Sequence, residues 1–223
     1  GLCDPDILKT MKYVIMCGGE YPAFATPKQL SVVKGERLAD RTVRLLKEAG
    51  AEEIYISSND PRFDDCGAVR LEHENHFKTD GHGHDEGYWL DAYYPHFEDD
   101  AKVTYLYGDV WYTKEAIELI VNYKTDGNIL FGTKDAKNEE HQNWGEPFAY
   151  IVNNYREFMN GVKAVKQMQD EGLLLRTAIT WELYRYLNRL DVNVQRVLDE
   201  TYVVIDDGTM DIDDPSHIER MER

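Results

Sequence analysis

Apolar residues recur along the chain in short runs separated by amphipathic stretches, an arrangement typical of alternating strands and helices. Residues 13–16 form a short apolar run that is partly β-branched, and residues 53–58 form a second one. Between them, residues 38–49 carry apolar side chains at helical spacing and end before Gly50, a common residue at a helix C-terminus. Strand, helix and strand within this length predict a βαβ unit and therefore a parallel sheet.

The same alternation continues to the end of the chain. Strands are also expected at residues 69–71, 101–107, 128–133, 144–152 (after a loop) and 203–205. Helices are expected at residues 114–123, 155–171, 180–188 and 216–222, and the aromatic-rich segment 87–94 predicts the start of another. The fold class predicted is α/β, with a mostly parallel central sheet flanked by helices. Because no composition shift or repeat divides the chain, residues 11–223 are expected to form one domain, with residues 1–10 as a lead-in or linker before Met11.

The first strand ends at Cys17-Gly18-Gly19, and a loop with two prolines then leads to Lys28. Paired glycines let another molecule approach the main chain, and main-chain N–H groups with one lysine can surround a phosphate. The stretch matches neither the G-x-x-x-x-G-K-[ST] loop nor the G-x-G-x-x-G fingerprint. A strand that simply ends in a glycine turn, followed by a surface lysine, is the alternative.

Acidic residues follow two of the expected strands. Asp109 comes directly after residues 101–107 behind a glycine, and the carboxyl edge of a parallel sheet is where α/β proteins bind ligands. It could instead cap the helix at 114–123, although Thr113 suits that position equally well. Alternation in Asp211-Ile212-Asp213 points both carboxylates to one side. Carboxylates with phosphate oxygens are typical Mg²⁺ ligands, so these acids are candidate metal ligands.

Composition narrows the function classes. The formal net charge of −17 argues against nonspecific nucleic-acid binding, which needs a basic surface. Three widely spaced cysteines without a C-x-x-C pair suit a reduced, cytoplasmic protein. No apolar run is long enough for a membrane span. The glycine-rich stretch around His82 and His84 is interpreted as a lid over a substrate, with a metal site as the alternative.

Five motifs, taken in order, carry a family resemblance. They are V-I-M-C-G-G at 14–19, T-P-K-Q-L at 26–30, V-K-G-E-R-L-x-D-R-T at 33–42, Y-L-Y-G-D-V at 105–110 and M-D-I-D-D-P at 210–215. Together they resemble the nucleotidyltransferase (NTP-transferase) superfamily with a Rossmann-like GT-A fold, which includes cytidylyltransferases for small phosphates and sugar-1-phosphate nucleotidyltransferases. The chain departs from the usual A-G-G-x-G-x-R loop, so Lys28, or alternatively Arg41 or a residue of the polar loop, is expected to contact more of the triphosphate.

The resemblance implies a reaction of the 2.7.7 enzyme class: transfer of a nucleoside monophosphate, with CTP as the expected donor, to a small phosphorylated substrate, with Mg²⁺ as cofactor and pyrophosphate released. It implies Lys28 and Asp109 as catalytic residues, with metal ligands at Asp109, Asp211 and Asp213. Nucleotide contacts are implied at Met16, Cys17, Gly18, Gly19 and Lys28.

The resemblance places the acceptor at Trp144 and Glu146, for which a packed aromatic and a solvated acid are the alternatives. The expected partners are the two substrates and, for assembly, a second copy of the chain, without nucleic acid or membrane. Two other functions stay open. One is a sugar-1-phosphate nucleotidyltransferase that uses UTP or dTTP; the other is a glycosyltransferase or a nucleotide-binding module that keeps the GT-A frame.

Overall fold

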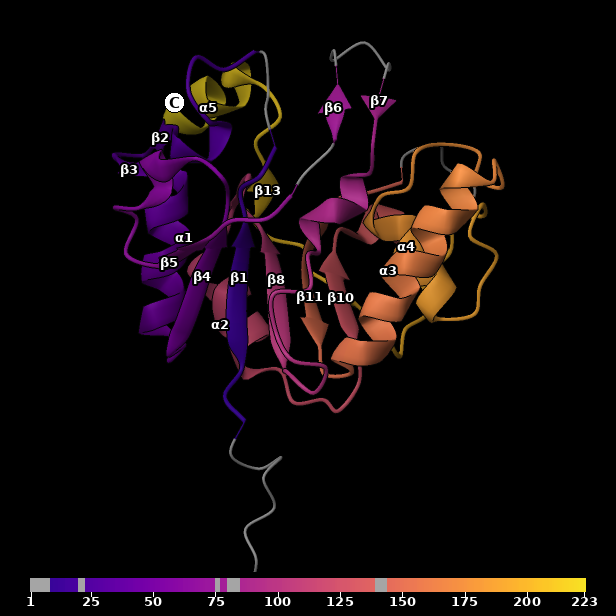
Figure 1. The fold of residues 1–223 in the computed structure, drawn as a ribbon. Helices are drawn as coiled ribbons and strands as arrows, with labels where there is room; N and C mark the ends of the chain where they lie inside the picture. Colours follow the sequence, from indigo (N-terminus) through magenta and orange to yellow (C-terminus); the bar gives the residue numbers. More distant parts are fainter. Residues whose placement is uncertain (1–8, 20–22, 75–76, 80–84, 139–143) are drawn as a thin grey trace, which may run out of the picture.

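The computed structural model describes residues 9–19, 23–74, 77–79, 85–138 and 144–223, so the segment with His82 and His84 lies outside the described residues. The central sheet contains β1 (Lys12–Met16), β4 (Glu53–Ser57), β5 (Val69–Leu71), β8 (Val103–Tyr107), β10 (Ile129–Gly132), β11 (Pro147–Val152) and β12 (Tyr202–Val204). These seven strands lie in the order β12-β10-β11-β8-β1-β4-β5 (Figure 1). Only β11 is antiparallel to its neighbours, β8 and β10.

Helices cover both faces of this sheet. The apolar sides of α1 (Leu38–Glu48) and α2 (Lys114–Asn122) pack with one face, and those of α3 (Tyr155–Asp170) and α4 (Thr180–Leu187) pack with the other. A hydrophobic core lies on each face of the sheet, and the alternating side chains of β1 contribute to both. Tyr13 and Ile15 pack on the side of α1 and α2, and Val14 and Met16 pack on the side of α3 and α4. The predicted α/β class, with a mixed and mostly parallel sheet flanked by helices, is confirmed.

The aromatic-rich segment was expected to begin a helix, and this expectation is wrong except for one short turn. The structure has only the 3₁₀ helix η4 (Trp89–Ala92). Leu90 and Tyr93, three residues apart, are both buried in the core. Pro95 disfavours helical backbone at Tyr94, so the chain cannot continue as an α-helix.

Three two-stranded ribbons complete the described β-structure, and none was expected from the sequence. They pair β2 (Val32–Val33) with β3 (Glu36–Arg37), β6 (Lys78–Thr79) with β7 (Asp85–Glu86), and β9 (Val110–Trp111) with β13 (Met210–Asp211). Strands of two residues are too short to show a period-two pattern.

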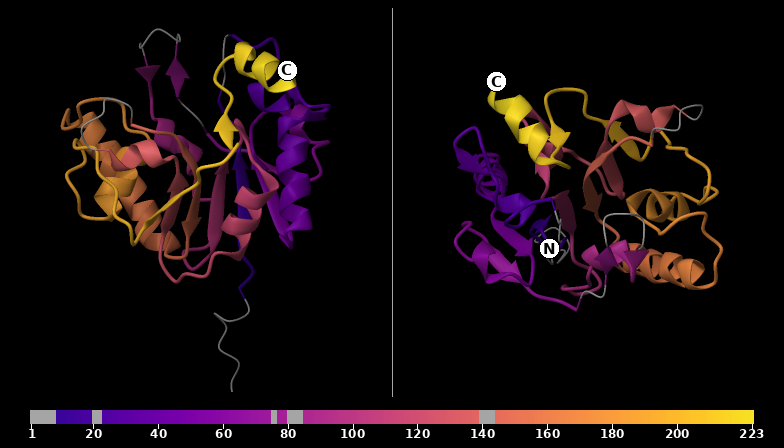
Figure 2. Two further views of the ribbon diagram at one scale, coloured as in Figure 1. Left: turned by 180° about the vertical axis from the view of Figure 1, so that it is seen from behind. Right: turned by 90° about the horizontal axis from the view of Figure 1, so that it is seen from above.

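The carboxyl ends of the parallel strands meet at one edge of the sheet. In Figure 1 this is the upper edge, where β1 ends and where β13 and the C-terminal helix α5 (Pro215–Glu222) also lie. The view from behind in Figure 2 shows the yellow C-terminal segment rising to the same edge, with its helix above it. None of the helices in the described part of the chain has the length and apolarity that crossing a bilayer would require.

Candidate active site

The glycine turn and Asp109 are neighbours because β1 and β8 pair in parallel. Met16 lies beside Tyr107 in the register, and the Gly108 N–H donates to the Met16 carbonyl at 3.0 Å. A Cβ atom at position 108 would lie 2.5 Å from both that carbonyl oxygen and the Cys17 Sγ. Glycine is therefore required here for the chain to turn and present Asp109. Thr113, not Asp109, caps α2 by accepting a bond from the Ala116 N–H at 3.0 Å.

The C-terminal acids reach the same edge through the β9–β13 ribbon. Asp211 pairs with Val110, and the Ile212 N–H donates to the Asp109 carbonyl at 2.7 Å. The Ile212 side chain is fully buried, while Asp211 and Asp213 are not, as the alternation predicts. Main-chain pairing thus fixes the spacing between Asp109 and the two later aspartates, which are about a hundred residues away in sequence.

Lys28 lies among these acids. Its side chain is 1% exposed, and its Nζ is 2.9 Å from Asp109 Oδ2 and 3.8 Å from Asp213 Oδ1. The short 3₁₀ helix η2 (Lys28–Leu30) begins at this residue, directly after Pro27. The sequence alternative of a surface lysine is therefore wrong, since Lys28 is buried in an ion pair.

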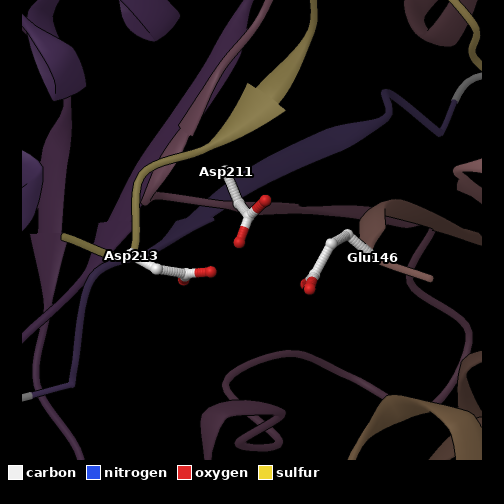
Figure 3. A group of neighbouring side chains, drawn as sticks. All are labelled: Glu146, Asp211 and Asp213. Atoms are coloured by element: carbon white, nitrogen blue, oxygen red, sulfur yellow. The ribbon is translucent and has the colours of Figure 1, made fainter. Parts of the chain in front are cut away.

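Glu146 completes a group of three carboxylates. One oxygen from each of Glu146, Asp211 and Asp213 lies within 4.8 Å of the other two, and Figure 3 shows the three side chains directed toward one another. We call Asp109, Glu146, Asp211 and Asp213 the carboxylate cluster. Of the described lysines and arginines, Lys28 is the one with its charged group within 4 Å of these carboxylates.

The crowding of negative charge shows in the acidities of the cluster. Desolvation of its carboxyl group beside Asp213 and Asp109, together with repulsion from those two charges, raises the pKa of Glu146 to about 7, although the residue is exposed. Burial, the hydrogen bond with Asp213 and the charge of Glu146 raise the pKa of Asp211 to about 8. Burial also raises the pKa of Asp109, although Lys28 opposes the shift. The pKa values of Asp109, Glu146 and Asp211 are therefore all raised, because Lys28 alone does not offset the burial and mutual repulsion of these carboxyl groups.

A hard divalent cation would supply that charge. Mg²⁺ takes oxygen ligands and usually binds through one or two carboxylates together with phosphate oxygens and water. The closely spaced oxygens of Glu146, Asp211 and Asp213 fit such an ion. Asp109 lies beside them and forms an ion pair with Lys28. Sequence reasoning placed Asp109, Asp211 and Asp213 in this role but assigned Glu146 to the acceptor. Nothing in the sequence signals its place, because that place depends on the backbone at Gly145.

The glycine turn lies at the margin of the cluster. Met16 and Cys17 are buried, and the Cys17 N–H donates to the Ser57 carbonyl at 2.9 Å, whereas Gly18 is exposed and Gly19 half-buried. Burial raises the pKa of the Cys17 thiol well above its usual value, so it is a core residue and not a nucleophile. Main-chain contact with a nucleotide at Met16, Cys17, Gly18 and Gly19 stays a prediction.

Two other predicted residues have protein partners. The Arg41 guanidinium lies 4.1 Å from the centre of the Trp111 ring and donates to the Tyr112 carbonyl at 2.9 Å. Arginine side chains also lie over Trp144, which is half-buried. These contacts favour the structural alternative for Trp144, and its role in binding an acceptor stays a prediction.

No family model matches the sequence, and no curated protein is similar enough to count as a relative. Solved structures do match along nearly the whole chain. A protein from Bacillus anthracis assigned as a glucose-1-phosphate thymidylyltransferase, solved with sucrose, has a TM-score of 0.61 at 14% identity, covering 95% of this chain and 94% of its own. Rv0371c from Mycobacterium tuberculosis H37Rv has a TM-score of 0.57 at 12% identity, covering 96% of this chain and 97% of its own.

The CTP:phosphocholine cytidylyltransferase LicC from Streptococcus pneumoniae also matches, with a TM-score of 0.57 at 14% identity, covering 96% of this chain and 98% of its own. The chain therefore has the nucleotidyltransferase fold, and the resemblance seen in the motifs is confirmed at the level of the fold. At these identities the similarity establishes the fold alone, so the reaction must be argued from the site.

Proposed function

We propose that this protein is a Mg²⁺-dependent nucleotidyltransferase. It joins the nucleoside monophosphate of a nucleoside triphosphate to a small phosphorylated substrate. In the reaction, a phosphate oxygen of the acceptor forms a new bond to the α-phosphorus of the triphosphate. The bond between the α-phosphorus and the oxygen that bridges to the β-phosphate breaks, and pyrophosphate leaves.

The observation that carries this proposal is the convergence of a buried lysine and four carboxylates at the carboxyl edge of the sheet. Three remote segments supply Lys28, Asp109 and the Asp211–Asp213 pair, and the backbone contacts described above hold two of them together. Transfers at phosphorus depend mainly on positioning and on stabilising charge, and they need no protein nucleophile. A site composed of carboxylates and one lysine suits that chemistry.

The proposed roles follow from position. Asp109 and the Asp211–Asp213 pair would hold Mg²⁺, with Glu146 as a further ligand, and the bound ion would neutralise phosphate charge. Lys28 would stabilise the negative charge that develops as pyrophosphate leaves. Gly18, which is exposed, and Gly19 would let the main chain approach the phosphates.

We favour CTP and a small phosphate acceptor as substrates for two reasons. The sequence lacks the Q-x-x-x-x-G-T segment that the resemblance leads us to expect in thymidylyl- and guanylyl-transferring sugar enzymes, and LicC shares the fold. A sugar-1-phosphate nucleotidyltransferase that uses UTP or dTTP is the second candidate, and the match to the Bacillus anthracis protein supports it.

The test is pyrophosphate release with Mg²⁺, using CTP, UTP, dTTP, ATP and GTP against phosphocholine, other phospho-alcohols and sugar 1-phosphates. The pair that reacts identifies both substrates. Asp109→Asn should abolish release and keep the fold, whereas the matched control Asp99→Asn, at an exposed ion pair with Arg156, should leave it unchanged. Nucleotide binding without release from any pair, or normal release by Asp109→Asn, would overturn the proposal.

A further inference from the structure

Two arginine side chains lie over the indole ring of Trp144. The Cζ of Arg176 is 4.4 Å from the ring centroid, and that of Arg185 is 4.6 Å from it. Guanidinium groups at this distance are attracted to the ring, and the attraction is stronger where water is excluded. Arg176 lies just before α4 and Arg185 within it, so α4 and the segment leading to it hold the ring.

Arg185 is an unusual residue to find in this place. It is 1% exposed, its Nη1 donates to the Val192 carbonyl at 2.9 Å, and its Nε is buried without a hydrogen-bond partner among the described residues. Burial lowers its pKa to about 10, so the group is still charged at neutral pH. A buried charge of this kind costs free energy that an apolar residue of similar size would not. A function beyond packing would explain why the chain carries it.

Glu182 fixes both arginines. It is 2% exposed, and its carboxylate receives Arg176 Nε at 2.9 Å and lies 3.6 Å from Arg185 Nη1. It also accepts a bond from the Ile179 N–H at the start of α4, at 3.3 Å. The arginines are thus anchored to the helix, and the indole ring lies on a rigid base.

The chain between Trp144 and Glu146 has little freedom to absorb a movement of the ring. Gly145 has a φ of +76°, and a Cβ there would lie 2.5 Å from Thr133 Oγ1 and 2.9 Å from the Ala136 nitrogen. The Glu146 N–H donates to Thr133 Oγ1 at 2.9 Å, and the Thr133 N–H donates to the Glu146 carbonyl at 3.0 Å. Thr133 therefore holds the Glu146 backbone directly, and a displacement of the Trp144 ring would reach Glu146 through the constrained link at Gly145.

We propose that Arg185 is a positioning residue that acts through Trp144 to hold the Glu146 carboxylate against Asp211 and Asp213. The inference rests on the proposed function only in requiring that the carboxylate cluster binds a divalent cation. Side chains that orient metal ligands typically change metal affinity by about 10–100-fold when they are replaced. Arg185 would do so without touching the cation or either substrate.

The experiment measures binding of Mn²⁺ to the full chain without nucleotide. The electron paramagnetic resonance signal of the free ion gives the unbound concentration in each titration. Mn²⁺ suits carboxylate ligands as Mg²⁺ does. Arg185→Met should weaken binding about tenfold. Arg185→Lys keeps the charge but loses the planar group, and should recover only part of that loss. The matched control is Arg156→Met, whose side chain is 73% exposed, and it should bind like the wild type.

A double-mutant cycle separates positioning from general damage to the fold. If Arg185 acts through Glu146, Arg185→Met should have no further effect in the Glu146→Gln background, because residues in one network are not additive. If Arg185→Met fails to fold, the same cycle can be measured with Arg176→Met, because the Arg176 side chain is 37% exposed.

Unchanged Mn²⁺ affinity in the Arg185 or Arg176 variants, or an equal loss with and without Glu146, would overturn the inference while leaving the proposed function intact. Absence of Mn²⁺ binding by the wild type would overturn the metal assignment, and this inference with it. In that case, the pyrophosphate-release assay would still report on the reaction.

Discussion

Replacing Gly145 by alanine adds a methyl group at a position next to Glu146 that has both a positive φ and close neighbours. The φ of +76° costs a residue with a Cβ about 1–2 kcal/mol. The new Cβ would also lie 2.5 Å from Thr133 Oγ1 and 2.9 Å from the main-chain nitrogen of Ala136. Both atoms must move away from it. Overpacking of this kind typically costs about 1–3 kcal/mol. Gly145→Ala should therefore lower the free energy of unfolding by about 2–5 kcal/mol.

Gly172 provides the matched control. Its φ is +72°, but no atom lies within 4 Å of the Cβ that alanine would add. Gly172→Ala should show the backbone term alone, about 1–2 kcal/mol. Urea denaturation of both variants gives the two free energies, and their difference reports the crowding at Gly145.

The same substitution should reach the site. To relieve the contact with Thr133, the hydrogen bonds that hold Glu146 must lengthen, so its carboxylate moves away from Asp211 and Asp213. We expect weaker Mn²⁺ binding for Gly145→Ala and unchanged binding for Gly172→Ala. Equal stability losses in the two variants, or full cation affinity in Gly145→Ala, would refute the view that this turn places Glu146.

Two further substitutions test the charge balance of the cluster. The folded-state pKa of Asp211, about 8, lies above its ordinary value, so its contribution to stability is present in acid and lost as pH rises toward 8. In thermal melting with a chelator, Asp211→Asn should therefore have a higher melting temperature than the wild type at pH 9 but not at pH 4. A constant difference between the two melting temperatures across this pH range would contradict the prediction. Lys28→Met removes the ammonium group 2.9 Å from Asp109 Oδ2, so it should raise Mn²⁺ affinity, measured by titration, while lowering turnover by about 10²–10³. Weaker Mn²⁺ binding, or undiminished turnover, would show that Lys28 does not have this role.

Local patterns were enough to predict much of the fold and part of the site. β1, α1 and β4 follow from apolar runs and helical spacing, which depend on neighbouring residues only. The meeting of Asp109 with the glycine turn follows from the rule that parallel strands end at one edge. The direction of Asp211 and Asp213 follows from strand alternation. Their grouping with Asp109 rested on the ligand preference of Mg²⁺ and was supported by the resemblance, because no local pattern shows that these segments meet.

The rest depends on contacts between remote segments. The β9–β13 ribbon joins residues about a hundred positions apart through strands too short to recognise. Glu146 joins the cluster because Gly145 adopts a positive φ against Thr133, which the sequence W-G-E-P does not reveal. The placement of Arg176 and Arg185 over Trp144 requires α4 and the segment before it to pack beside Trp144, which is tertiary information.

The most direct test of the account is to follow the phosphorus atoms of the nucleotide. CTP labelled at the α-phosphate, and separately at the γ-phosphate, would be incubated with Mg²⁺, the protein and the acceptor panel, and the products separated. The account predicts that the α-label enters an organic product joined to the acceptor, while the γ-label leaves as pyrophosphate. The same labelling pattern with UTP or dTTP, and not with CTP, would indicate the second candidate, a sugar-1-phosphate nucleotidyltransferase. Transfer of the γ-label to the acceptor, or no labelled product from any nucleotide, would contradict nucleotidyl transfer at this site.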